Sequence, residues 1–247
     1  MRQFLMAALA ALPLAAMPQS ALVPTQHGDF GHYTFALTWQ PGICSTEEGC
    51  TAEQPREPLI GLHGLWASRP KGLIDSGLPR TTWWSRGCDL YHHSSAPPPI
   101  SAALDTRVES VMPHFAHSLL MHEYDKHVQC FGFDPTLFFT TELSMRDAVV
   151  RSPFGAYLMH QAGRAVKHGA VIADFEKAFA TGHGASLQLQ CGRNAQGQEV
   201  LTQFWITIKA DALAAFPGSS SLMDATTVQD TCPGRFLIPA WPKKAAM

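Results

Sequence analysis

Six cysteines constrain the fold of this 247-residue chain more than any other feature. None of them forms a Cys-x-x-Cys pair, the spacing typical of zinc ribbons and thioredoxin-like redox sites. An even number of cysteines without that spacing predicts disulfide bonds and therefore an oxidising compartment. Six cysteines allow fifteen pairings, among which the spacing alone does not choose. They stand at Cys44, Cys50, Cys88, Cys130, Cys191 and Cys232.

The N-terminus has the order of a secretory signal peptide. Arg2 supplies a positive charge, residues 4–16 are almost wholly apolar, and small residues follow. The apolar run is shorter than the roughly 20 residues of a transmembrane helix, and the alternative is a buried N-terminal helix. We predict a signal peptide over residues 1–21, cut between Ala16 and Gln26, and one mature domain over residues 27–247. The mature protein is then periplasmic or secreted, with no membrane segment.

The composition predicts a globular domain. Hydrophobic residues make up 46% of the chain and charged residues 15%, which excludes a disordered chain and disfavours a coiled coil. The formal net charge of −2 excludes a polycationic nucleic-acid binder. The chain has 12 histidines, and protonation of all of them would raise that charge to +10. Histidine titrates between about pH 5 and 8, so an anionic partner is attracted more strongly in mild acid.

The residue pattern predicts an α+β fold, a central and mostly antiparallel sheet with several packed helices and disulfide bonds. Alternating or apolar segments predict strands at residues 33–40, 59–66, 186–191, 200–209 and 236–238. Helical spacing predicts helices at residues 104–120, kinked or split at Pro113, 135–149 after an Asp134 N-cap, 154–163 and 172–180. We expect residues 72–99 and 210–231 to be connections.

The first segment that indicates chemistry is residues 62–66, Leu-His-Gly-Leu-Trp. It places His63 and Trp66 at the end of a predicted strand, with Gly64 allowing another group to approach the backbone closely. Taken alone, a histidine beside a tryptophan is more typical of a structural histidine than of a catalytic one.

The second segment, residues 122–130, combines two histidines, two acids and a lysine. On a helix, His122 and Lys126 are neighbours four residues apart, and so are Glu123 and His127. We therefore expect Glu123 to orient His127, with positive charge beside it for an anion. A charged surface is the plain alternative. A zinc site is disfavoured because His122 and His127 would lie roughly 140° apart around an α-helix, with Lys126 between them.

Together, these two segments resemble the active-site segments of the ribonuclease T2 family, the secreted acid endoribonucleases. The resemblance lies in His-Gly-Leu-Trp at residues 63–66 and His-Glu-Tyr-Asp-Lys-His-Val-Gln-Cys at residues 122–130. Residues 130–135 and the strand and turn at residues 33–44 favour the bacterial periplasmic branch of the family.

The resemblance implies a role for each matching residue. His63 would be the general acid on the leaving 5′-oxygen, His127 the base that takes the ribose 2′-OH proton, and His122 a phosphate-binding group. Glu123 and Lys126 would assist the base and stabilise the phosphorane.

The resemblance further implies that Trp66 binds a base and that the disulfides are Cys44–Cys50, Cys88–Cys130 and Cys191–Cys232. The expected enzyme is a monomer that cleaves single-stranded RNA with low base specificity, leaves 2′,3′-cyclic phosphate and 5′-OH ends, does not cleave DNA, and needs no metal or other cofactor.

Three positions depart from the family pattern. Val128 replaces a glycine, Ala67 replaces a proline, and Ser68 stands where some members carry an acidic residue for base recognition. A positive φ at position 128 would strain a valine. Val128 leaves open a catalytically silent relative that binds RNA or another polyanion. A histidine-rich periplasmic metal-binding protein is the second alternative.

Overall fold

The computed structural model describes residues 22–47 and 49–242, so the predicted signal peptide lies outside the described residues. Six strands form one sheet in the order β2-β1-β5-β6-β3, with β4 paired to β5. Only the β5–β6 pair is parallel among the pairs described, which confirms the α+β fold and its mostly antiparallel sheet. The strands are β1 (His32–Trp39), β2 (Ile60–Ala67), β3 (Arg164–Lys167), β4 (Leu187–Arg193), β5 (Glu199–Lys209) and β6 (Arg235–Ile238).

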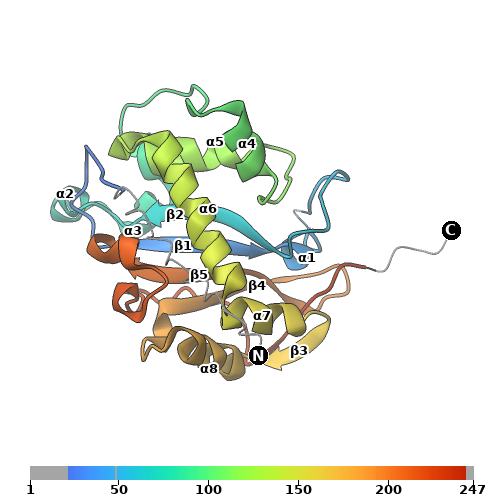
Figure 1. Ribbon diagram of the computed structural model, residues 1–247. Coiled ribbons are helices and arrows are strands. Elements are labelled where there is room, and N and C mark those ends of the chain that lie inside the picture. Colours follow the sequence, from blue (N-terminus) through green and yellow to red (C-terminus); the bar gives the residue numbers. More distant parts are fainter. Residues whose placement is uncertain (1–21, 48, 243–247) are drawn as a thin grey trace, which may run out of the picture.

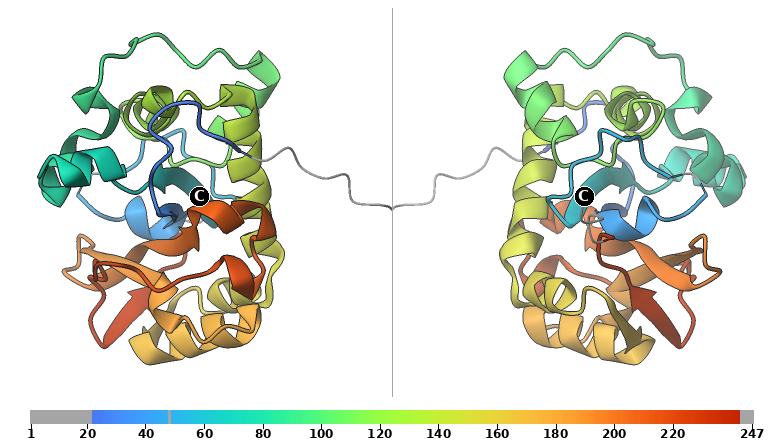
Figure 2. Two further views of the ribbon diagram at one scale, coloured as in Figure 1. Left: turned by 90° about the vertical axis from the view of Figure 1, so that its left-hand side faces the viewer. Right: turned by 90° about the vertical axis from the view of Figure 1, so that its right-hand side faces the viewer.

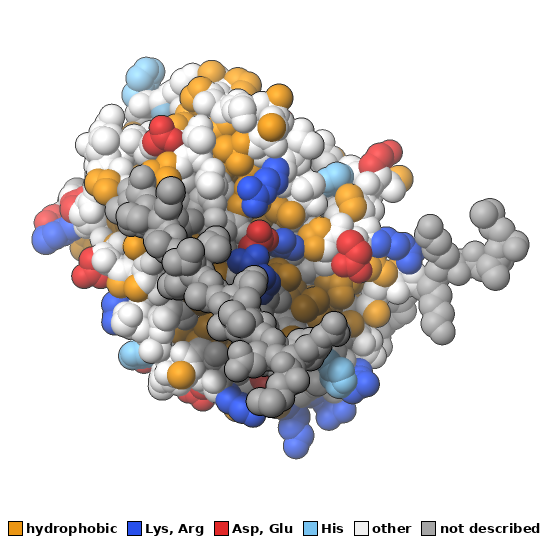
Figure 3. All heavy atoms as spheres, in the orientation of Figure 1, with side chains coloured by type: hydrophobic (Ala, Val, Ile, Leu, Met, Phe, Trp, Pro, Cys, Tyr) orange, Lys and Arg blue, Asp and Glu red, His pale blue; other side chains and the backbone are white. Residues whose placement is uncertain are grey.

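Helix α6 crosses one side of the sheet, and α2 and α3 lie on the other (Figures 1 and 2). Positive, negative and apolar side chains are all visible on the α6 side (Figure 3). Within residues 22–47 and 49–242, no helix combines the length and apolarity needed to span a bilayer. The helices are α1 (Gln40–Ile43), α2 (Lys71–Asp75), α3 (Arg80–Arg86), α4 (Ala102–Glu109), α5 (Leu119–Glu123), α6 (Pro135–Arg151), α7 (Pro153–His160) and α8 (His168–Phe179).

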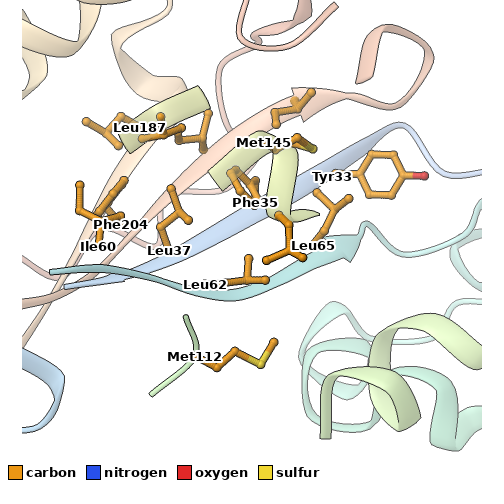
Figure 4. Close-up of a cluster of buried hydrophobic side chains, with 14 of the residues drawn as sticks. Tyr33, Phe35, Leu37, Ile60, Leu62, Leu65, Met112, Met145, Leu187 and Phe204 are labelled. Atoms are coloured by element: carbon orange, nitrogen blue, oxygen red, sulfur yellow. The ribbon is translucent and has the colours of Figure 1, made fainter. Parts of the chain in front are cut away.

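The side of the sheet toward α6 is the hydrophobic core. Phe35 of β1 pairs with Leu65 of β2 and with Ile206 of β5, and all three are fully buried. Figure 4 shows Phe35 and Leu65 close to Met145, which comes from α6. Both the Nε and Nη2 atoms of Arg146 donate to the carbonyl oxygen of Ile60, which fastens α6 to the start of β2.

The opposite side of the sheet carries small, polar and indole side chains. Strand alternation places Ala36, Gly64 and Trp205 there, because Ala36 pairs with Gly64 on one side and Trp205 on the other. Gln203 lies two residues before Trp205 and therefore on the same side. The sheet thus has a dry face toward α6 and a polar face that remains available for a cleft.

Some segments differ from their expected form. The helix predicted over residues 104–120 is split into two helices at Pro113, one of the two expected outcomes, because proline has no N–H to continue a helix. Between them the carbonyl oxygen of Val111 accepts hydrogen bonds from Leu62 N, at 2.8 Å, and Gln40 Nε2, at 3.2 Å. The expected connection at residues 72–99 contains most of α2 and all of α3, and that at 210–231 contains two short 3₁₀ turns.

Three disulfide bonds are present among the described residues, and they join the pairs that the family resemblance implies. Cys88–Cys130 links segments 42 residues apart and tethers the last residue of the second predicted active-site segment. The other two are Cys44–Cys50 and Cys191–Cys232.

Candidate active site

A cleft of about 620 Å³ opens on the polar face of the sheet. Side chains from β1, β2, β4, β5, α3, α5 and the segment after α5 line it. The cleft brings together every candidate residue from the two sequence segments, namely His63, Trp66, His122, Glu123, Lys126 and His127. A cleft of this volume accommodates a nucleotide-sized ligand.

His63 occupies an irregular position in β2. Leu62 pairs with Leu37 and Gly64 pairs with Ala36, so His63 has no partner on β1. Such a β-bulge bends the strand and redirects a side chain. The bulge lets His63 reach the cleft while the leucines on either side of the His-Gly pair stay in the core.

Gly64 allows the Glu123 carboxylate to lie directly on the sheet. A Cβ atom at position 64 would fall 1.9 Å from Oε2 of Glu123. That oxygen accepts a hydrogen bond from Nε1 of Trp66 at 2.6 Å, and Oε1 lies 3.4 Å from Nε2 of His63. The shortest contacts of Glu123 are therefore with Trp66 and His63, and its charge also favours the protonated form of His127.

The helix through the second segment changes type where the chemistry lies. Helix α5 ends at Glu123, and residues Tyr124–Val128 form a π-helical turn. The ring centroids of His122 and His127 are 6.3 Å apart, so the separation expected for an α-helix was wrong. The wider π turn brings these residues, five positions apart, toward the same cleft.

This turn also brings His122, Glu123 and His127 within reach of one cation. Their potential ligand atoms lie within 4.8 Å of one another. The two carboxylate oxygens already face Trp66 and His63, and Lys126 lines the same cleft. We therefore do not assign this cluster as a metal site.

Comparison with known proteins agrees with the geometry of this cleft. The sequence pattern of the Ribonuclease T2 family matches residues 30–218, which include the whole of both active-site segments. The chain belongs to the ribonuclease T2 family. It is 29% identical to Ribonuclease I of Escherichia coli (strain K12) over 241 residues, which cover 87% of this chain and 89% of that protein. The chain is thus an endoribonuclease, and RNA is its substrate.

Solved structures share the fold of this ribonuclease. RNase NT in complex with 5′-AMP has a TM-score of 0.61 at 18% identity, over 85% of this chain and 98% of that one. Ribonuclease MC1 from the seeds of bitter gourd has a TM-score of 0.55 at 21% identity, over 84% of this chain and 100% of that one. These structures extend the likeness to nearly the whole described chain.

The histidines of this ribonuclease titrate in different surroundings. Burial lowers the pKa of His127 to about 4, although the Glu123 charge acts in the opposite direction. Burial also lowers the pKa of His122, and the Lys126 charge adds to that effect. Burial raises the pKa of Glu123, but positive charge on His127 and contacts with His63 and Trp66 outweigh it, so the net pKa is lowered. The lowered pKa of the buried Glu123 favours its ionised form, which interacts with His63 and His127.

The departures from the family pattern fit their places in the ribonuclease. Val128 has φ −120° and ψ −52°, so the valine avoids the left-handed region, and its side chain is fully buried. The Ser68 hydroxyl accepts hydrogen bonds from the backbone N–H groups of Gly31 and His32, both at 3.2 Å. Position 68 therefore braces the cleft wall through the backbone.

Two residues of β5 join the site that the motifs alone did not indicate. Oε1 of Gln203 lies 2.9 Å from Nδ1 of His63, and the Trp205 ring meets the Trp66 ring edge-to-face at 5.3 Å. The alternation of β5 predicts that these two side chains share a face. No local pattern places that face opposite a histidine 140 residues earlier in the chain.

Proposed function

We propose that this ribonuclease cleaves single-stranded RNA by transphosphorylation. His127 takes the proton of the ribose 2′-OH, and the resulting 2′-oxygen forms a bond to phosphorus. The bond between phosphorus and the 5′-oxygen breaks as Nε2 of His63 gives its proton to that oxygen. The products are a 2′,3′-cyclic phosphate and a 5′-OH end.

The arrangement of the two histidines around Trp66 carries this proposal. The Trp66 ring lies 5.1 Å from the His63 ring and 5.4 Å from the His127 ring, measured between centroids. A nucleotide seated at this indole has an imidazole on either side. Because the pKa of His127 is lowered to about 4, this ring is a free base in mild acid. The contact between His63 and Glu123, at 3.4 Å, is that of an ion pair when His63 is protonated.

His122 and Lys126 supply the positive charge that the reaction needs. Both line the cleft beside His127. Preorganised cations near the non-bridging oxygens stabilise the extra negative charge of a phosphorane. Protein side chains alone then provide the base, the acid and the electrostatic stabilisation, so we propose a reaction that needs no metal ion.

The chemistry also limits the substrate. A nucleophile supplied by the 2′-OH excludes DNA as a substrate. The Trp66 indole stacks on any base, an interaction worth about 1–3 kcal/mol. The Ser68 hydroxyl is bound to backbone amides, and its side chain carries no charge to select a base. We therefore propose low base specificity.

We propose a periplasmic or secreted location for a monomeric enzyme that is free of the membrane. The predicted signal peptide and the three disulfide bonds support this location. In such a compartment the disulfides form without a reducing system to oppose them.

The decisive experiment digests EDTA-treated mixed RNA with the mature protein near about pH 5–6, inside the histidine range. We expect oligonucleotides that end in 2′,3′-cyclic phosphate, with unchanged rates when EDTA is present. Intact RNA beside folded, disulfide-bonded protein would favour the silent RNA-binding relative. Activity that EDTA abolishes and a divalent metal restores would favour a metal site at His122, Glu123 and His127.

A further inference from the structure

We propose that Gln203 is a positioning residue that fixes the tautomer and the orientation of His63. This inference rests on the proposed role of His63 as the general acid, and it adds a residue of β5 that neither motif contains. Its basis is a chain of hydrogen bonds from Trp205 through Gln203 to His63.

The indole of Trp205 determines which end of the Gln203 amide faces His63. Nε1 of Trp205 lies 3.0 Å from Oε1 of Gln203, and Nδ1 of His63 lies 2.9 Å from the same oxygen. An indole N–H is only a donor, so the amide group that meets it must be the carbonyl oxygen. A reversed amide would place N–H against N–H.

The same oxygen then determines the state of the His63 ring. A carbonyl oxygen only accepts, so Nδ1 of His63 must carry a proton and donate it. The neutral ring is therefore the Nδ1–H tautomer, and Nε2 is the nitrogen that gains and loses a proton. Nε2 faces Glu123 at 3.4 Å, on the cleft side of the ring.

This tautomer suits the proposed acid step. When Nε2 of His63 gives its proton to the 5′-oxygen, the ring is left as the Nδ1–H form that Gln203 already binds. No proton has to move between the ring nitrogens and the ring does not rotate. The hydrogen bond at Nδ1 thus orients Nε2, the reactive nitrogen, as is common for catalytic histidines.

The sheet explains how a glutamine on β5 reaches a histidine on β2. Strand β1 lies between them. Its residue opposite Gln203 is Thr38, and the next residue on the same face is Ala36, which lies between Gly64 and Trp205 and has a small side chain. The β-bulge turns His63 toward that gap. Glu123 and Trp66 face His63 on the other side, so the ring is held between a carboxylate and an amide.

Two substrates distinguish a role of Gln203 in positioning His63 from a general loss of activity caused by a damaged fold. A dinucleoside phosphate has an alkoxide leaving group that needs a proton, whereas a nucleoside 3′-aryl phosphate has an aryloxide leaving group that departs without one. We expect Gln203→Leu to lower kcat for the dinucleoside by about 100-fold, the cost of a misplaced catalytic group. We expect kcat for the aryl ester to change less than about 3-fold, because general acid catalysis contributes little to that reaction.

Conservative variants and a neighbour serve as controls. Gln203→Glu keeps an acceptor at Nδ1, so we expect it to restore most of the dinucleoside activity and to extend that activity to higher pH, since a carboxylate favours the cationic ring. Gln190 of β4 pairs with Gln203, but its side-chain amide donates to the carbonyl oxygen of Gln229 and not to His63. Gln190→Leu is therefore the neighbouring control. We expect it to retain the ratio of the two substrate rates.

Nitrogen NMR of His63 gives a readout that does not depend on turnover. We expect the neutral ring to be protonated at Nδ1 in the wild type and to shift toward Nε2–H in Gln203→Leu. An Nε2–H wild type, or equal losses on both substrates in folded Gln203→Leu, would overturn the inference. His63→Ala tests the acid role of His63 separately from the positioning role of Gln203. Equal losses on both substrates in His63→Ala would overturn the acid role itself.

Discussion

Gly64 carries no functional group, yet the cleft depends on its size. The Glu123 carboxylate occupies the space that a side chain at position 64 would need. Because that carboxylate also contacts His63 and Trp66, one added methyl group disturbs three catalytic or binding side chains together.

We therefore predict that Gly64→Ala lowers kcat/KM on RNA by about 100-fold, since small displacements of catalytic groups have effects of that size. Steady-state kinetics on the folded variant measures this. Gly169→Ala is the matched control, because no other group lies within 4 Å of a Cβ at that position of α8. A Gly64→Ala enzyme as active as Gly169→Ala would contradict the close approach of Glu123.

His127 gives the second prediction for a single residue. His127→Ala removes the proposed base, and we expect turnover of RNA to fall by about 10²–10⁴-fold, the usual contribution of general acid–base catalysis. His160→Ala alters an exposed histidine at the end of α7 and should leave turnover unchanged. Near-normal turnover by His127→Ala would remove this residue from the mechanism.

At the scale of secondary structure, the π turn and helix α6 determine the surroundings of Glu123. The π turn brings His122 and His127 to one cleft, and α6 packs behind β2 with a second acid, Glu142, fully buried. Burial raises the pKa of Glu142 well above its usual range, and the Glu123 charge adds to that effect. The fold therefore shifts the two buried acids in opposite directions, raising the pKa of Glu142 and lowering the pKa of Glu123.

The raised pKa of Glu142 makes stability depend on pH. Above the unfolded pKa of about 4.3, the unfolded chain releases this proton while the folded chain retains it, so its stabilising contribution declines as pH rises. A glutamine side chain at this position has no such proton, so we predict that Glu142→Gln gains stability over the wild type with rising pH, at up to about 1.4 kcal/mol per pH unit. Thermal unfolding between pH 4 and 8 measures this, with the exposed Glu109→Gln as the control. A difference independent of pH would mean that Glu142 is ionised in the fold.

The sequence predicted the elements with strong periodicity, such as β1, β5 and α6, because one side of each is buried in the core. It did not predict β3, whose four residues include only one buried side chain, Val166. The π turn was also missed, because the spacing of residues 122–127 is interpreted through α-helical geometry unless the tertiary contacts are known. Both failures concern segments whose conformation is determined by distant parts of the chain.

At the scale of the whole molecule, the motifs identified a cleft that two distant segments build. The grouping of His63 with His122, Glu123, Lys126 and His127 follows from the family resemblance that the two motifs carry. The contact of Gln203 with His63 depends on strand order and on the bulge in β2, and neither has a signature in the local sequence.

The whole-molecule charge and the His127 environment together predict the pH–rate profile. We expect kcat/KM to rise as pH increases through about 4, because His127 loses its proton there and becomes a base. We expect it to fall again at higher pH, because the proposed acid must carry a proton to give to the 5′-oxygen. Initial rates on a dinucleoside phosphate across pH 3–9 measure both limbs. A profile that is flat, or maximal only in alkali, would contradict a mechanism with paired histidines.

The two faces of β5 expose adjacent codons to different kinds of selection. Phe204, Ile206 and Ile208 are fully buried, whereas Gln203 and Trp205 line or brace the cleft. Within residues 203–208, substitutions at the even-numbered positions should alter how much enzyme accumulates, and substitutions at the odd-numbered positions should alter its activity. In a mutational library scored separately for abundance and for RNA cleavage, the two kinds of effect should then alternate from one residue to the next along this part of the strand.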